Sequence, residues 1–329
     1  EEQQRLAHVP TENIEALELY FAGRQLWATR SGEAIEPSVR YFERAIELDP
    51  DFALAHAGLA DAYLVLPEYS ASIDRKIVWG RSEAAAETAL ALDPDLPEAL
   101  TSMAWSRLIH NYDWQEAERL LQRAVEIQSN NADSLHWLSH VLSWQGRHEE
   151  ALRWARQAVE ADPLSNLMKG NLGYILMDAG EFDRAIAIDD ELLEREPNSS
   201  RMRNLWLTYL RAGRPEEAAN ALERWASATD RDPEAAEKVG GLFIQYKDTG
   251  EPAFLSSDLV ARLEIGSEDL AQVYAFIGDR ESTLAALESA YRERSGSRSV
   301  LSMKVNPGYD FVRDNPRFVE LMRLVRLQE

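Results

Sequence analysis

The sequence ADSLHWLSHVLSWQGRHEEALRWARQAVEADPLS (residues 132–165) shows the pattern that decides the fold. Leucines recur at helical spacing in its first half, and alanines recur at helical spacing in its second half. The two halves meet at Gly146 and the stretch ends near Pro163, and both residue types end helices. This stretch therefore predicts two helices that are joined by a tight turn into a hairpin.

The end of this stretch recurs along the chain. Related phrases are AIELDPDF (45–52), ALALDPDL (89–96), AVEIQSNN (124–131), AVEADPLS (158–165) and LLEREPNS (192–199). Ser129, Pro163 and Pro197 hold equivalent positions at intervals of 34 residues. A period of 34 residues is typical of the tetratricopeptide repeat, and the chain resembles that family.

Extending this register predicts an all-α, right-handed α-solenoid of about eight hairpins over residues 12–297. One repeat is longer than the others around residues 66–76, which predicts a longer loop and a lengthened second helix. The hairpin at about 233–266 is irregular because Gly240 and Gly241 weaken its helical pattern. We expect residues 298–329 to form a C-terminal loop and a capping helix that begins at Pro316.

Composition narrows the classes of function. The formal net charge is −22, and an acidic surface repels phosphate backbones, so nucleic acid is not an expected partner. The chain has no cysteine, which excludes disulfides and thiolate metal sites, and it has no apolar run long enough to insert into a membrane. No glycine-rich phosphate loop or nucleophile motif is present, so we expect neither an enzyme nor a cofactor.

A closer resemblance is to the C-terminal repeat arrays of bacterial signalling proteins that carry a winged-helix domain, a nucleotidyl cyclase or a Ser/Thr kinase. The residues that carry it are PTENIEALELYFAGR (10–24), YFERAIELDPDFALAHAGLADAY (41–63), NYDWQEAERLLQRAVE (111–126) and NPGYDFVRDNPRFVELMRLV (306–325). This resemblance implies a scaffold or sensor region that binds a protein or peptide partner. The expected location is cytoplasmic, or periplasmic if a transmembrane segment precedes residue 1.

The family resemblance also implies a concave groove that is lined by one face of each first helix. In this sequence the corresponding residues are Trp105, Asp133, His136, His140, Trp144, Tyr174, Arg201, Asn204, Thr208 and Arg211. Aromatic and arginine side chains are good anchors for a bound peptide. The alternative is that Trp105 and Trp144 pack between hairpins as core residues.

Two other functions remain open from the sequence. His136 and His140 are four residues apart on one helical face, with Asp133 one turn earlier, a spacing that could bind a metal ion or another small ligand. Surface histidine pairs are usually only a polar face, so this metal site is the weaker interpretation. A self-association surface on the C-terminal tail or on the irregular hairpin would instead make a homo-oligomer.

Overall fold

The computed structural model describes residues 11–29, 32–69, 73–195, 199–293 and 298–327. Helices and turns make up these residues, with no strand among them, so the predicted all-α class is confirmed. The chain divides into a first compact unit that ends at Leu138 and a second that begins at Ser139. Each unit is described by itself below.

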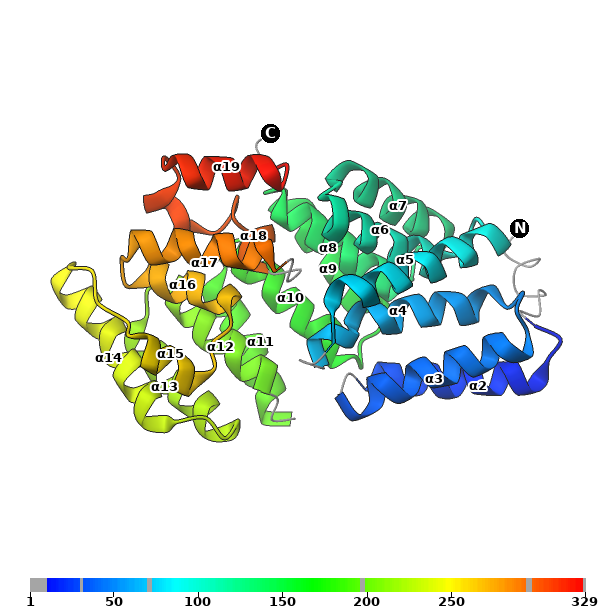
Figure 1. Ribbon diagram of the computed structural model, residues 1–329, viewed down its shortest axis with the longest axis horizontal. Coiled ribbons are helices and arrows are strands. Elements are labelled where there is room, and N and C mark those ends of the chain that lie inside the picture. The colour runs from blue at the N-terminus through cyan, green and yellow to red at the C-terminus, as the bar shows by residue number, and fades with distance from the viewer. Residues whose placement is uncertain (1–10, 30–31, 70–72, 196–198, 294–297, 328–329) are drawn as a thin grey trace. The chain divides into compact units, whose positions relative to one another are not determined.

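The first unit is a succession of antiparallel helical hairpins (Figure 1). Its helices are α2 (Ile14–Ala28), α3 (Gly32–Leu48), α4 (Ala53–Tyr69), α5 (Arg75–Leu92), α6 (Pro97–Asn111), α7 (Trp114–Ile127) and the first part of α8 (Ala132–Trp144). The extra residues of the long repeat lengthen both of its helices, because α4 has 17 residues and α5 has 18. Residues 70–72 of the expected longer loop lie outside the described residues.

The second unit continues the same hairpin pattern and ends in shorter elements. Its helices after α8 are α9 (His148–Ala161), α10 (Asn166–Asp178), α11 (Phe182–Arg195), α12 (Ser199–Arg211), α13 (Pro215–Ala228), α14 (Pro233–Thr249), α15 (Ser257–Leu263), α16 (Ser267–Phe276), α17 (Arg280–Arg292), α18 (Arg298–Leu301), the 3₁₀ helix η1 (Pro307–Val312) and α19 (Pro316–Leu324). The described helices from α2 to α17 pair into eight hairpins, as the repeat pattern predicts.

Local chemistry sets the ends of these helices. The side chain of Asp113 accepts a hydrogen bond from the backbone N–H of Glu116 at the start of α7, and Ser165 caps the start of α10 in the same way. Gly146 and Gly180 follow first helices with φ of 88° and 79°, a conformation that costs glycine little. The predicted hairpin turns are therefore confirmed at both glycines.

Small residues let neighbouring helices approach closely. Ala151, Ala158 and Ala185 are completely buried, as expected for positions where two helices cross. The irregular hairpin also has a small residue at a close helix contact, since a methyl group on Gly240 would lie 2.6 Å from Cβ of Ala219. α14 therefore runs without a break through Gly240 and packs against α13.

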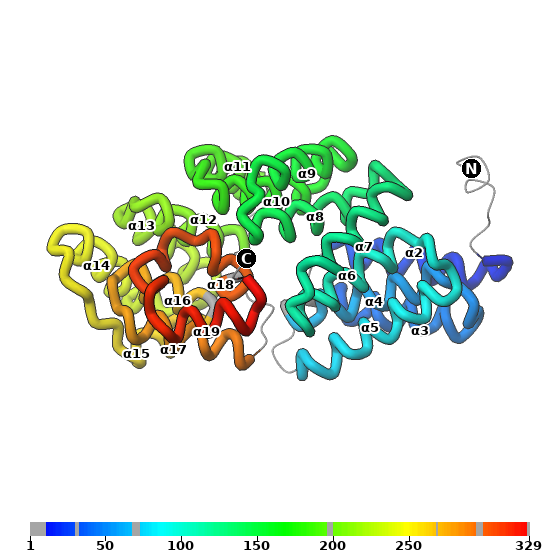
Figure 2. The backbone as a smooth tube through the Cα atoms, turned by 90° about the horizontal axis from the view of Figure 1, so that it is seen from above, coloured from blue at the N-terminus to red at the C-terminus, as the bar shows by residue number. Residues whose placement is uncertain are grey.

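The C-terminal elements cover the last hairpin of the second unit. α18 and η1 contact both α16 and α17, while α19 contacts α17 (Figure 2). Phe318 and Leu321 of α19 and the following Val325 are buried, so the apolar stripe of this helix packs inside the second unit. The preceding segment differs from the predicted loop because part of it forms the short helices α18 and η1.

Candidate functional site

The first helices of the first unit bring four charged side chains together. They are Arg24 from α2, Asp61 from α4, Glu98 from α6 and Asp133 from α8, and we call them the charged cluster. These residues are up to 109 positions apart in the sequence. Stacking of successive hairpins therefore builds the cluster, because each helix supplies one member.

Arg24 links the cluster. Its Nη1 donates a hydrogen bond to Oδ2 of Asp61 at 3.0 Å, and its Nη2 lies 3.7 Å from Oδ2 of Asp133. Its guanidinium carbon also lies 4.3 Å from the ring centroid of Trp27, a cation–π contact. Burial disfavours the charged form, but the attraction of Asp61 and the other acidic neighbours outweighs it and raises the pKa of Arg24. The side chain is therefore a fixed cation.

The other members leave the cluster with excess negative charge. Burial raises the pKa of Glu98, with Arg24 opposing this shift and Asp133 adding to it. Ser102 donates a hydrogen bond to Asp61 and fixes its carboxylate. Burial also raises the pKa of the Tyr20 phenol to about 12, so this neighbour stays neutral. Within the cluster, three carboxyl groups thus share one guanidinium.

An aromatic pair continues the same helix faces. Trp105 and Trp137 have ring centroids 4.1 Å apart, and the ring of His136 is stacked on Trp137 at 4.6 Å. Trp137 lies one helical turn after Asp133 on α8. Trp105 is 9% exposed and His136 is 6% exposed, whereas Trp137 and Asp133 are more accessible. The accessible part of this surface therefore combines a carboxylate with an aromatic edge.

In the second unit, the expected groove residues on α8 and α10 pack against each other. The rings of His140 and Trp144 are stacked with centroids 4.9 Å apart, and Tyr174 lies 6.4 Å from His140. His140 and Trp144 are each only 2% exposed. This burial favours the alternative that Trp144 is a core residue.

Arg201 and Asn204 of α12 hold a buried carboxylate of α11. Nη1 of Arg201 and Nδ2 of Asn204 donate to the two oxygens of Asp189, at 2.9 Å and 2.6 Å. Burial raises the pKa of Asp189, and the Arg201 guanidinium opposes that rise. Gly170 leaves room for this guanidinium, because a methyl group there would lie 2.0 Å from Nη2 of Arg201. Arg201 and Asn204 therefore join α12 to α11 through Asp189.

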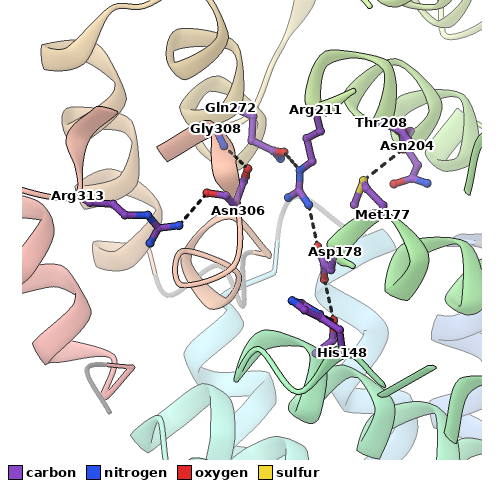
Figure 3. A network of polar contacts seen from close by, with 11 residues as sticks. His148, Met177, Asp178, Asn204, Thr208, Arg211, Gln272, Asn306, Gly308 and Arg313 are labelled. Carbon is purple, nitrogen blue, oxygen red and sulfur yellow. Dashed lines mark hydrogen bonds and ion pairs between the residues drawn. The ribbon is translucent and has the colours of Figure 1, made fainter. Parts of the chain in front are cut away.

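Arg211 of α12 connects helices that are distant in sequence (Figure 3). Its Nη1 donates to Asp178 of α10 at 2.7 Å, and its Nε donates to Gln272 of α16 at 2.9 Å. Ser143 lies 3.5 Å from both Asp178 and His148. Thr208, also on α12, is fully buried and donates to the sulfur of Met177 at 3.2 Å.

The space beside this network is small. A cavity of about 20 Å³ is lined by Tyr174, Met177, Arg203, Asn204, Leu207, Arg211, Asp269, Gln272 and Ser299. That volume holds about one water molecule. In the second unit, this cavity lies between α10, α12, α16 and the start of α18.

Sequence reasoning missed Arg24, Asp61 and Glu98. In the repeat register, Asp61 holds the position that Trp105 holds in the third repeat, and Glu98 holds that of Asp133. Extending the groove positions to the second repeat would have found Asp61. Arg24 lies in the last turns of α2, and its significance rests on contacts between hairpins, which no single repeat reveals.

The hypothesis of a metal site gains no support. Among the described residues, no group of three or more histidine, aspartate or glutamate side chains is arranged to hold a metal ion. His136 and His140 instead each stack on the tryptophan rings named above. Asp133 lies beside Arg24.

Comparison with known families agrees with the hairpin pattern. Two tetratricopeptide-repeat models match this chain, one over residues 37–75 and the other over residues 108–170. The first match covers most of α3 and all of α4, and the second covers α7, α8 and α9. No curated protein matches the chain as a relative.

Several solved structures align with this chain at low sequence identity. The Cut9–Hcn1 hetero-tetramer of the APC/C aligns with a TM-score of 0.51 and 17% identity, over 69% of this chain and 46% of that one. TTC0263, a thermophilic repeat protein of Thermus thermophilus, aligns at 0.47 and 18%, over 60% and 98%. PilW, a type IV pilus biogenesis factor, aligns at 0.47 and 16%, over 77% and 97%.

No helix in the described parts of the chain is both long and apolar enough to cross a membrane. The described helices form hairpins, and the first helices of these hairpins supply the polar and aromatic faces described above. The matched models and the paired helices together show that the chain contains tetratricopeptide repeats.

Proposed function

We propose that this chain is a non-catalytic scaffold that binds a protein or peptide partner on the first-helix face of its first unit. The observation that carries the proposal is the charged cluster, in which Asp61, Glu98 and Asp133 lie around the guanidinium of Arg24. A basic side chain of the partner would balance the remaining negative charge. Trp137 would supply an adjacent aromatic contact.

We therefore limit the proposed peptide-binding groove to the part that lies on the first unit. Asp133 and Trp105, with the neighbouring Trp137, remain as proposed contacts, and His136 supports Trp137 by stacking. The later candidates on α12 join helices of the second unit, and we no longer propose them as partner contacts. A cytoplasmic role within a bacterial signalling protein is part of the proposal and rests on the resemblance of the sequence.

A peptide library of random extended sequences tests the proposal. The purified chain is expected to enrich peptides with lysine or arginine next to an apolar residue. Asp133→Asn removes an accessible carboxylate and should weaken binding of the enriched peptides about five-fold, roughly 1 kcal/mol. Asp51→Asn is the control, because Asp51 is an exposed carboxylate on the turn before α4.

Titration calorimetry with the enriched peptides separates the outcomes. Loss of affinity in Asp133→Asn, with no loss in Asp51→Asn, supports the assigned face. Equal affinities of all three proteins would contradict it, and so would enrichment of acidic peptides. Circular dichroism and melting temperature establish that both variants fold.

A further inference from the structure

Part of the C-terminal tail lies against a turn of the second unit that is distant in sequence. Val305 contacts the turn between α8 and α9, because a methyl group on Gly146 would lie 3.8 Å from its Cγ1 atom. Tyr309 on η1 is completely buried, and the charge of Arg211 on α12 acts on its phenol. We call residues 302–309 the strap, since they connect the last hairpin to a turn that lies 159 positions earlier.

The strap holds its own shape through hydrogen bonds within the tail (Figure 3). The backbone N–H of Asn306 donates to the carbonyl of Ser302, and its side-chain oxygen accepts from the N–H of Gly308 at 2.9 Å. The carbonyl of Asn306 accepts from the N–H of Tyr309 at 3.2 Å and from Nη2 of Arg313 at 3.3 Å. The turn is therefore preformed, and these bonds persist if it leaves the face on which it lies.

Both ends of the strap are anchored by contacts of their own. Before the strap, Val300 and Leu301 of α18 are buried, and α18 contacts α16 and α17. After it, Arg317 at the start of α19 forms ion pairs with Glu281 and Glu288 of α17, each at 2.6 Å. Release of the strap therefore does not require release of α18 or α19.

The docked strap leaves polar groups poorly satisfied. The hydroxyl of Tyr309 lies near the Asn306 side chain, but it has no well-formed hydrogen bond among the described residues. The same is true of the buried hydroxyl of Ser302. A buried polar group without a partner lowers stability. The two hydroxyls therefore weaken the docking of the strap, and another segment of similar shape could compete with it.

The chemistry of the strap defines the class of ligand that fits this site. Pro307 and Gly308 are exposed at the tip of the turn, whereas Asn306 and Tyr309 on either side of them are buried. Asn, Pro and Gly favour a tight turn, and the tyrosine supplies a large apolar surface with a polar tip. The site therefore takes a tight turn that is followed directly by an aromatic residue.

We propose that the second unit has a binding site for a protein segment with a tight turn followed by an aromatic residue, and that the strap occupies this site as an autoinhibitory contact until such a segment displaces it. This inference goes beyond the proposed function. The charged cluster belongs to the first unit, whereas the strap and the turn at Gly146 belong to the second. Neither proposal requires the other.

A labelled peptide of residues 302–313 tests this inference by competition with the strap in the full chain. The tethered strap has a high effective concentration, so the peptide is expected to bind the parent chain weakly. Tyr309→Ala removes the main buried side chain of the strap, and Val305→Asp disrupts its contact with the α8–α9 turn. Each variant should bind the peptide at least ten-fold more tightly in fluorescence anisotropy, because fewer sites are occupied by the strap.

Val319→Asp is the matched control, because Val319 is an exposed valine of the same tail on α19. It should leave peptide binding as weak as in the parent chain. A peptide that itself carries Tyr309→Ala should not bind the two strap variants. Asp133→Asn in the charged cluster should not change any of these affinities, so the two proposals fail or succeed separately.

Hydrogen exchange of the same variants separates release of the strap from loss of the fold. The proposal expects reduced protection in the strap and in the α8–α9 turn, with α17 and α19 still protected. Loss of protection throughout α16 and α17 in both strap variants would show that the strap is part of the core and would overturn the proposal. Unchanged peptide affinity in both variants would also overturn it, as would equal binding of the two peptides.

Discussion

The guanidinium of Arg201 fills the space beside Gly170 and reaches the completely buried carboxylate of Asp189. Gly170→Ala would ordinarily stabilise a helix by about 0.5–1 kcal/mol. Here the added methyl group must displace the guanidinium, which leaves a buried carboxylate poorly paired. We expect a net loss of about 1–3 kcal/mol in the free energy of unfolding, measured by urea denaturation.

Gly241 provides the control for this substitution. It is an exposed residue within α14, and a methyl group there would meet nothing within 4 Å. Gly241→Ala should therefore stabilise the protein by about 0.5–1 kcal/mol. Stabilisation of both variants would show that the ion pair of Asp189 contributes little.

His148 gives the second unit a dependence on pH. Burial lowers the pKa of its imidazole, although Asp178 opposes the shift. As the pH falls, His148 therefore binds a proton in the unfolded chain before it does so in the folded protein, near the ordinary histidine pKa of about 6.5. The stability that His148 contributes is present above that pH and is lost as the pH falls through it toward the folded-state pKa.

His148→Gln should flatten this part of the stability curve. We expect the melting temperature of the variant to fall less steeply than that of the parent chain between about pH 7 and pH 5. The check is a series of thermal scans at constant ionic strength. Identical slopes in the two proteins would contradict the assigned role of His148.

The sequence predicted only some of the residues that form the charged and aromatic surface of the first unit. Asp133 and Trp105 were found because their repeats keep the 34-residue register. Arg24 and Asp61 lie in the first two repeats, where the longer second repeat makes the register harder to follow. The contact between these two residues joins neighbouring hairpins, so it depends on stacking rather than on a local pattern.

At the scale of whole helices, Arg211 joins α10, α12 and α16. The side chains of Arg211 and Asp178 are each 5% exposed. Arg211→Met leaves Asp178 as a buried charge without this partner, and we expect a loss of about 3–5 kcal/mol in the stability of the second unit. Chemical denaturation followed by tryptophan fluorescence measures this change.

A double variant tests whether the buried charge causes that loss. Arg211→Met with Asp178→Leu removes both charges and should recover more than half of the lost stability. If the double variant is as unstable as the sum of the two single variants, the cause is lost packing instead of the uncompensated carboxylate.

Most helices could be predicted because periodicity and end signals act locally. The 34-residue repeat, the turn glycines and the helix-starting Pro316 all give correct elements. Gly240 was misleading, since its small size serves the packing of α14 on α13 and does not interrupt the helix. The contact of α12 with α16 could not be predicted, because no repeat pattern encodes a contact across 61 residues.

At the scale of the whole molecule, a destabilising substitution in a repeat protein mainly affects the repeats around it, because each repeat mainly contacts its neighbours. Arg211→Met should therefore reduce amide protection in α10, α12 and α16 while leaving α3 and α4 protected. Hydrogen exchange followed by mass spectrometry measures both regions in one experiment. Equal loss of protection in α3 and α4 would show that the chain unfolds as one cooperative body.

The contacts of Arg211 also bear on how the second unit would respond to a pulling force. A simple array of hairpins extends one hairpin at a time, since each hairpin is released separately. Arg211 joins α12 to a residue 61 positions later, so the hairpins between them cannot lengthen freely until that contact breaks. Stretching with optical tweezers should therefore show one large extension step for this region, and Arg211→Met should divide it into smaller steps.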